Sequence, residues 1–232
     1  MYAVIADELG ARIDAGELAP DAPLPSEREL SERWEVARMT VRQALGLLER
    51  RGLIYRRHGA GTFVSPPKLI QDAARLRGFF EQTIEQGAVP ASRIVSAKQV
   101  PATRSMAYTL ALHVGDPVFE VVRLRSVRGE PVVLETSFFP AGRFPRLLDH
   151  DLASRSIYRL MDEYYGGRPT SANQIIEAVA VRTAESALLH IPVGSIVLRL
   201  ERTSSDKSGR PVEYAIDLYR ADRTRFVTHL TL

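Results

Sequence analysis

A short stretch from Arg38 to Gln43 places several hydrogen-bonding side chains on one side of a predicted helix. In "EVARMTVRQALGLLERRGL" apolar residues recur at the i, i+3, i+4 and i+7 positions of a buried helical face, namely Val41, Ala44, Leu45 and Leu48. The other face carries forked donors for guanine or phosphate, a hydroxyl donor and an amide that can read adenine: Arg38, Arg42, Thr40 and Gln43. For this segment alone, the alternative is an ordinary solvated face.

Three further positions could contact the same nucleic acid. Arg28, at the start of the preceding helix, could contact the DNA backbone. In "RRHGAGTF" the glycines at 59 and 61 permit positive φ and close approach of the backbone to a ligand, and His58 could donate to a phosphate or a minor-groove edge. Alternatively, Gly59 and Gly61 only shape a hairpin turn and His58 is a surface residue.

A second set of charged residues lies in "RLRSVRGEPVVLE". Arg123 and Arg125 are two apart on a predicted strand, so they project from the same face. If the hairpin loop is Arg128-Gly129-Glu130, the register places Glu135 opposite Arg123. Two guanidiniums form a fork for an anion, and a carboxylate beside them accepts hydrogen bonds. A cross-strand salt bridge facing water is the alternative.

The elements that position the first set form a compact pattern. Apolar spacing predicts a helix over residues 3–15, and a capping box of Ser26 and Glu29 begins a second helix that ends near Trp34. The Arg38–Gln43 helix follows after a short turn, and two β-prone runs about "HGAG" follow that. Residues 1–65 are therefore expected to be a winged helix-turn-helix DNA-binding domain, and "SPPKL" predicts a linker over residues 66–75.

The remaining residues, 76–232, contain an internal repeat. After a predicted helix from about Ala73 to Gln86, "LALHVGDPVFEVVRLRSVRGEPVVLETSFF" resembles "LLHIPVGSIVLRLERTSSDKSGRPVEYAIDLY". The alignment pairs Gly115 with Gly194 and Gly129 with Gly209. Two copies of helix, strand, hairpin and strand predict a pseudo-symmetric domain with an antiparallel sheet, so the fold class is α+β.

Composition bounds the class of protein. The chain has 232 residues, 45% of them hydrophobic and 25% charged, as expected for a globular protein with a core. It has no cysteine, which excludes disulfides and cysteine nucleophiles. The acidic N-terminus is unlike a signal peptide and no run approaches about 20 apolar residues, so we expect a cytoplasmic protein without membrane contact.

Charge is distributed unevenly along the first domain. Residues 1–35 hold three arginines against nine acidic residues, whereas residues 36–64 hold six arginines against one glutamate. Positive potential is therefore concentrated where a polyanion would meet the predicted recognition helix. The five histidines have no metal-site spacing, and no Ser-His-Asp arrangement or phosphate loop stands out, so no metal or cofactor is expected.

With these motifs in place, the chain resembles a known family. "LPSERELSERWEVARMTVRQALGLLERRGLIYRRHGAGTFV" is similar to the DNA-binding domain of the GntR family of bacterial transcription regulators. The remainder, through "RLRSVRGEPVVLE", "SIY" and "GRPVEYAIDLYRADRTRF", resembles the UTRA effector-binding domain of the HutC subfamily, whose antiparallel-sheet fold is related to chorismate lyase. The resemblance implies a homodimer that binds a short inverted repeat in double-stranded operator DNA. It also implies a small acidic effector, such as an amino-sugar phosphate or a carboxylate.

The resemblance also implies roles for individual residues. The DNA contacts would come from Arg28, Arg38, Thr40, Arg42, His58, Gly59 and Gly61. The effector contacts would come from Phe79, Arg123, Arg125, Glu135, Ser156, Tyr158, Glu213 and Tyr219. Three positions depart from the family pattern: Ala37 replaces a capping serine, Glu35 replaces a turn glycine, and Phe80 replaces a hydroxyl residue that contacts phosphate.

The sequence therefore predicts a ligand-responsive, sequence-specific transcription regulator, most simply a repressor, with residues 76–232 binding effector and forming the dimer. Two alternatives stay open at this point. The second domain could be an enzyme of chorismate-lyase-like fold. The winged helix could be a protein-interaction module.

Overall fold

The computed structural model describes residues 1–57 and 59–230. The chain divides into two compact units, Met1–Lys68 and Leu69–Leu232. Each unit has its own hydrophobic core.

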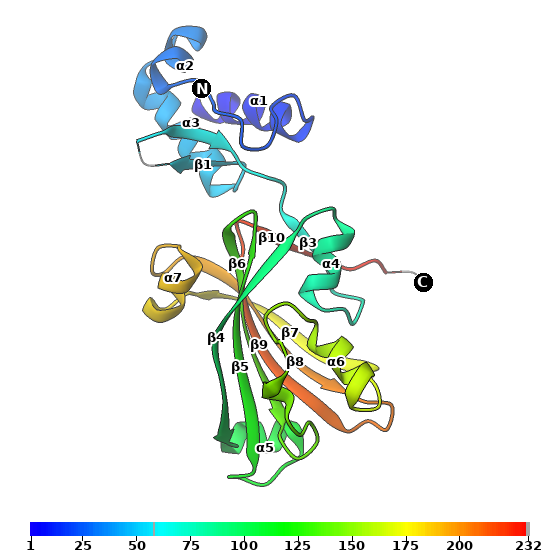
Figure 1. Ribbon diagram of the computed structural model, residues 1–232. Helices are drawn as coiled ribbons and strands as arrows, with labels where there is room; N and C mark the ends of the chain where they lie inside the picture. The colour runs from blue at the N-terminus through cyan, green and yellow to red at the C-terminus, as the bar shows by residue number, and fades with distance from the viewer. Residues whose placement is uncertain (58, 231–232) are drawn as a thin grey trace. The chain divides into compact units, whose positions relative to one another are not determined.

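The first unit is a three-helix domain with a two-stranded wing (Figure 1). It contains α1 (Tyr2–Asp14), α2 (Glu27–Trp34), α3 (Arg38–Arg50), β1 (Ile54–Arg57) and β2 (Gly61–Val64). The predicted apolar stripe of α3 is fully buried, and it packs against residues of every other element of the unit: Ile5, Leu9, Leu30, Ile54 and Val64. Because β1 and β2 pair antiparallel next to α3, the unit is a winged helix-turn-helix, as predicted.

Local signals in the chain explain where α2 and α3 begin. The Ser26 amide donates to Glu29 Oε2 at 2.8 Å, and the Glu29 amide donates to Ser26 Oγ at 3.3 Å, so the predicted capping box is confirmed. Glu35 ends α2 in the left-handed region, with φ of 51°, where a residue with a Cβ costs about 1 kcal/mol. Ala37 precedes α3 in an extended conformation and supplies no side-chain cap.

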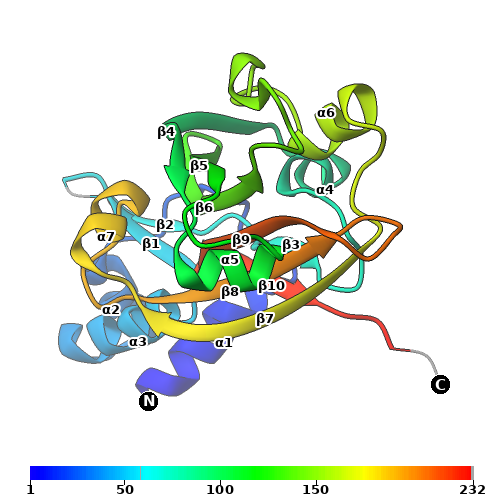
Figure 2. The same cartoon turned by 90° about the horizontal axis from the view of Figure 1, so that it is seen from below.

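The second unit is built on one six-stranded antiparallel sheet in the order β4-β5-β6-β9-β8-β7 (Figure 2). The strands in this order are Pro90–Pro101, Pro117–Val127, Glu130–Pro140, Pro211–Arg220, Ile196–Ser205 and Ser171–Ala180. The two sequence repeats form the two halves, which meet where β6 pairs with β9. The pseudo-symmetric antiparallel sheet expected from the repeat is therefore present.

Helices cover both faces of this sheet. On one face α5 (Arg104–Leu110) and α7 (Thr183–Leu189) pack against apolar side chains that include Val118, Leu124 and Phe138. On the other face lie α4 (Phe79–Glu85), α6 (Ile157–Tyr164) and a 3-10 helix (Leu147–Asp149). The odd-numbered residues of β5 point to this second face, which therefore receives Arg123 and Arg125.

Two predicted features of this region are wrong. Residues 69–72, expected within the linker over 66–75, form strand β3 (Leu69–Asp72), which pairs in parallel with β10 (Thr224–Val227). The helix expected from Ala73 begins at Phe79 instead. The intervening segment is a turn, in which the Ala74 amide donates to Asp72 Oδ1 at 2.9 Å.

The predicted pairing of Arg123 with Glu135 is confirmed, although the expected loop is not. The turn is a two-residue loop, Arg128-Gly129, with φ of 54° and 79°. A β-bulge that leaves Val132 unpaired then adds one residue to β6 and restores the register. The same bulge leaves Val212 unpaired in the second repeat.

Candidate functional site

The α3 surface presents the first set of predicted residues. Arg38, Arg42 and Gln43 are exposed on the first turns of α3, and Thr40 is partly exposed beside them. Arg28 is exposed on the first turn of α2, where its Nη1 lies 3.0 Å from Glu32 Oε1. Forked donors and an amide therefore project from one helix end, in the arrangement that a recognition helix needs in the major groove.

One residue of this surface was not predicted from the sequence. Glu27, at the first position of α2, accepts from Arg42 Nη2 at 2.9 Å and lies 4.0 Å from Arg56 Nη1. The hydrogen bond from Arg42 lowers the pKa of Glu27, so the carboxylate stays charged. Glu27 therefore fixes the orientation of Arg42 across the helix-turn-helix. Its position at the start of the capped helix was visible in the sequence, but its partner was not.

The wing carries the glycines of "HGAG". Gly59 and Gly61 have φ of 73° and 113°, and a Cβ added at either would meet nothing within 4 Å. Their backbone conformation, rather than crowding, therefore requires glycine. Arg57 stacks over the Phe63 ring at 4.9 Å, which holds its guanidinium on the wing. His58, also predicted to contact DNA, lies outside the described residues.

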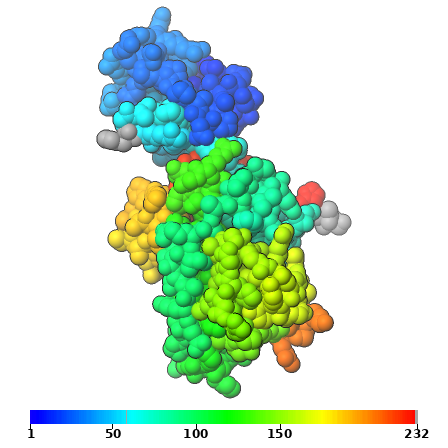
Figure 3. Space-filling view, viewed as in Figure 1, coloured from blue at the N-terminus to red at the C-terminus, as the bar shows by residue number. Residues whose placement is uncertain are grey.

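The second unit brings all eight predicted effector residues into one cleft between the sheet, α4 and α6. The cleft is lined by Phe79, Arg123, Arg125, Glu135, Ser156, Tyr158, Glu213 and Tyr219, together with Gly78, Phe80, Ser137, Ile157, Arg202, Ala215 and Asp217. The space open to the centres of water molecules is about 40 Å³, enough for about three waters. Figure 3 shows the α4 and α6 segments in contact on this side of the unit.

Buried ion pairs organise the sheet side of the cleft. Glu135 Oε2 accepts from Arg125 Nε at 2.8 Å and lies 3.0 Å from Arg123 Nη2. Burial disfavours the charged form of Glu135, yet the two guanidiniums hold its pKa below its ordinary value. The predicted fork thus exists, but it is buried and shares one carboxylate, so the water-facing salt bridge considered above is wrong.

A hydroxyl network occupies the α6 side of the cleft. Tyr158 OH donates to Glu213 Oε2 at 2.6 Å, and Ser204 Oγ donates to the same oxygen at 2.9 Å. Burial and the neighbouring Glu213 raise the pKa of the Tyr158 phenol. Tyr158 therefore stays a neutral hydrogen-bond donor at ordinary pH.

Two charged residues of the cleft were missed by sequence reasoning. Asp217 lies directly across from Glu135 in the β6–β9 ladder, and burial beside that carboxylate raises its pKa well above the ordinary value. Arg202 donates to Gln174 Oε1 at 3.1 Å. Within the described residues, Arg202 has no carboxylate at ion-pair distance. The repeat could have identified Arg202, because a spacing of 79 residues, as between Gly115 and Gly194, relates it to Arg123.

Several polar atoms of the cleft lack a partner among the described residues. They include Arg123 Nε, Arg125 Nη1 and Asp217 Oδ1. A buried donor or acceptor without a hydrogen bond costs about 1 to 3 kcal/mol. These atoms are therefore available to a ligand that enters the cleft.

Other kinds of site were also considered. Within residues 1–57 and 59–230, no group of three histidine, cysteine or acidic side chains could hold a metal ion. None of the helices of the described chain has the length and apolar character required to cross a membrane.

A winged helix-turn-helix with a basic recognition helix, followed on the same chain by a domain with a buried charged cleft, is the architecture of transcription regulators that bind DNA and respond to a small molecule. Residues 1–64 match the family described as bacterial regulatory proteins, gntR family, and residues 85–225 match the UTRA domain. The chain belongs to the GntR family of bacterial transcription regulators, in the group that carries a UTRA domain.

Individual relatives agree along nearly the whole chain. The HTH-type transcriptional repressor NagR of Bacillus subtilis is 36% identical over 230 residues, which cover 99% of this chain and 94% of NagR. The HTH-type transcriptional regulator Rv0792c of Mycobacterium tuberculosis is 32% identical over 228 residues, 96% of this chain and 82% of that protein. The crystal structure of PhnF from Mycobacterium smegmatis matches with a TM-score of 0.71 and 31% identity, covering 97% of this chain and 98% of PhnF.

These relatives decide between the open alternatives for the chain as a whole. They are transcription regulators, and the chain is a regulator rather than an enzyme of chorismate-lyase-like fold. A DNA-binding domain joined to a UTRA effector domain implies DNA and a small molecule as its partners.

Proposed function

We propose that the protein is a repressor that binds a short inverted repeat as a homodimer and is controlled by a small acidic effector held in the UTRA cleft. The residues proposed to contact DNA are Arg28, Arg38, Thr40, Arg42 and Gln43, with the wing glycines Gly59 and Gly61 and with His58. A dimer with two such heads would read two half-sites about one helical turn apart.

The observation that carries the acidic effector is the unequal charge pairing of the cleft. Arg123 and Arg125 share Glu135, while Arg202 pairs only with the neutral Gln174. Burial works against the charged form of Arg202, but nearby Tyr158, Tyr219 and Asp217 raise its pKa, so it carries a positive charge. A carboxylate or phosphate would supply the missing negative charge and would accept from the unpartnered guanidinium nitrogens. An amino-sugar phosphate is one candidate of this kind.

The path from the cleft toward the DNA-binding unit would begin with α4. Phe79 and Phe80 of α4 line the cleft, and two glutamines on the same helix hold the backbone of β3. Gln86 accepts from the Ile70 amide at 2.8 Å, and Gln82 accepts from the Asp72 amide at 2.7 Å. Because β3 begins at the residue after Lys68, a shift of α4 would reach the boundary between the two units.

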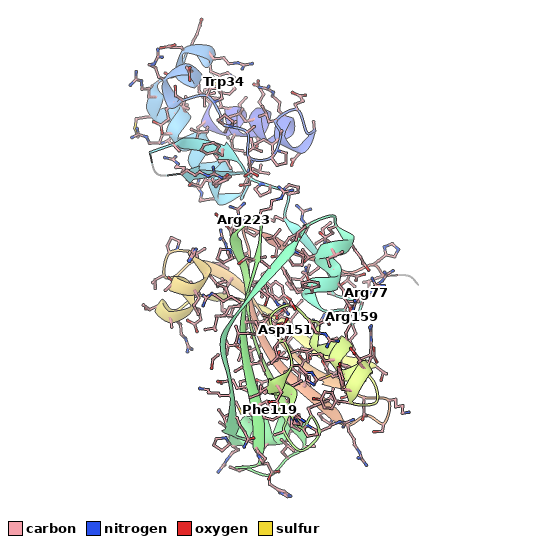
Figure 4. The ribbon with its side chains drawn as sticks, in the orientation of Figure 1. Trp34, Arg77, Phe119, Asp151, Arg159 and Arg223 are labelled. Carbon is pink, nitrogen blue, oxygen red and sulfur yellow. The ribbon has the colours of Figure 1, made fainter. Side chains whose placement is uncertain are left out.

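The small free volume supports a moving α4. An effector larger than about three waters must enlarge the cleft, and the polar clasp between α4 and α6 is a single pair, Arg159 Nε to Glu81 Oε1 at 3.3 Å. Figure 4 shows Arg77 and Arg159 close together where α4 faces α6. Exposed pairs of this kind contribute about 0 to 1 kcal/mol, so α4 can move at low cost. A coupling of about 1 to 3 kcal/mol would change operator affinity about 5- to 150-fold.

The DNA assignment is tested by selecting bound fragments from the source genome and measuring affinity for the recovered operator. Arg42→Ala should weaken binding by about 1 to 3 kcal/mol, because a base or phosphate contact of the recognition helix is lost. Arg50→Ala, at the exposed last turn of the same helix, is the matched control and should change affinity much less. Equal effects of the two variants would contradict the major-groove assignment and favour the protein-interaction role.

The effector assignment is tested with anionic metabolites that raise the unfolding temperature of the protein. Arg202→Gln should reduce the response to such a ligand by about tenfold or more while operator affinity stays unchanged. Arg199→Gln is the control, because Arg199 lies on the same strand but on the other face of the sheet, paired with Glu177 and Glu201. An unaltered ligand response in the Arg202 variant would place the effector elsewhere.

A further inference from the structure

The two edges of the six-stranded sheet differ in how they are protected. Edge strand β4 has prolines at both ends, Arg93 and Lys98 along its length, and a bulge between Ile94 and Ser96. Charges, prolines and bulges are the devices by which edge strands avoid pairing with other chains. The β4 edge is therefore built to remain unpaired.

Edge strand β7 has none of these devices. Its ten residues, "SANQIIEAVA", contain no proline, glycine, lysine or arginine, and they pair with β8 without a register shift from Ser171 to Ala180. Eight of the ten residues are exposed. Figure 2 shows β7 along the outer border of the sheet. Such a long, regular and unprotected strand presents a row of backbone donors and acceptors to a partner.

The side chains of β7 are also apolar for an exposed strand. Ile175 is 61% exposed on one face, and Ile176 is 38% exposed on the other. Ile176 lies on the same face as Ala178, Ala180 and Ile196, and Ile196 is 57% exposed. The only charge of the strand, Glu177, is already paired with Arg199 Nη1 at 3.2 Å.

We propose that β7 is the surface through which two copies of this chain associate, by antiparallel pairing of β7 with β7 of the second copy. This inference names the surface of the homodimer in the proposed function and rests on that homodimer. A two-fold axis perpendicular to the sheet aligns an edge strand antiparallel with its own copy, and the pairing uses the same patch on both subunits. It joins the two sheets into one continuous sheet.

The composition of β7 favours a second copy as its occupant. Because the strand has one charge in ten residues, self-pairing brings no like charges together unless the axis passes through Glu177 itself. Every second residue of β7 directs its amide and carbonyl away from β8, and a copy of the same strand matches this row along its full length. The exposed isoleucines of the two copies would then shield each other.

A matched pair of substitutions tests the proposal in the full-length protein. Ala178→Lys places a charge on the β7 edge, and Ala97→Lys places the same charge at an exposed position of the β4 edge. We expect Ala178→Lys to raise the dimer dissociation constant about tenfold or more, and Ala97→Lys to change it by less than about twofold. Sedimentation velocity over a dilution series measures both.

Amide hydrogen exchange of the unmodified protein gives a second measurement that does not depend on a variant. The β7 amides should become protected as the protein concentration rises through the dissociation constant, while the β4 amides do not change. A dimer unaffected by Ala178→Lys, with β7 exchange independent of concentration, would overturn the β7 assignment and leave the proposed function intact. A chain that stays monomeric and binds no inverted repeat would overturn both. Retention of β7 by an unrelated protein in place of a second copy would also overturn the inference.

Discussion

Restoring a cap to the recognition helix should stabilise the DNA-binding unit. The residue before α3, Ala37, has φ of −62° and ψ of 144°, close to the −62° and 159° of Ser26, which caps α2 through its hydroxyl. In Ala37→Ser the new hydroxyl would therefore be positioned to accept from the amide of Thr40, the third residue of α3. In the present structure that amide donates only to the Ala37 carbonyl at 2.9 Å.

The expected gain follows from the general value of a helix cap. Replacing alanine by serine at such a position contributes about 1 kcal/mol. In a unit of about 70 residues, a change of that size shifts the midpoint of thermal unfolding by about 4 to 8 °C. Ser26→Ala removes an existing cap and should lower the midpoint by a similar amount.

The assay can follow this unit selectively. Trp34 is the single tryptophan of the chain, and it packs against the core of the first unit at the end of α2 (Figure 4). Its fluorescence therefore reports unfolding of residues 1–68 within the full-length protein. Ala37→Val, which adds bulk without a hydroxyl, is the control and should give no gain. A midpoint unchanged by Ala37→Ser, or raised equally by Ala37→Val, would refute the capping argument.

Two further predictions follow from buried or paired carboxylates. Glu27→Gln removes a negative charge beside Arg42 and frees that arginine, so affinity for unrelated DNA should rise about two- to five-fold while the ratio of operator to unrelated DNA falls; fluorescence anisotropy at fixed salt measures both, and an unchanged ratio would contradict the orienting role of Glu27. Asp217→Asn should stabilise the protein increasingly as pH rises. Because the folded pKa of Asp217 is raised above 3.8, wild-type stability from this group is present at low pH and declines by up to about 1.4 kcal/mol per pH unit until the folded pKa is reached. Urea unfolding of both proteins between pH 4 and pH 8 measures the gap, and a gap independent of pH would contradict the prediction.

Local signals made the first unit largely predictable from sequence. The capping box at Ser26, the buried stripe of α3 and the glycine turn of the wing each act over a few residues, so their pattern is complete within the segment. The partnership of Glu27 with Arg42 joins residues 15 apart on different helices, and no periodicity reports it. It depends on the angle at which α2 meets α3.

The segment between the units was predicted less well because distant residues determine it. Strand β3 pairs with β10, about 150 residues later, and Gln82 and Gln86 supply further partners to its backbone. A sequence window that ends near residue 86 contains no information on β10. The prolines of "SPPKL" therefore suggested a longer linker than the structure has.

The internal repeat held more information about the cleft than was taken from it. The bulges at Val132 and Val212 are equivalent, and a spacing of 79 residues relates the strand segments that precede them, Arg123 in β5 and Arg202 in β8. The two halves meet at β6 and β9, so equivalent residues on the covered face converge on one cleft from both sides. Arg123 faces Glu135 across its hairpin, whereas Arg202 faces Ala215. The loss of the acidic partner in the second copy leaves one arginine of the cleft available to an acidic ligand, which is why the repeat bears on the choice of effector as well as on the fold.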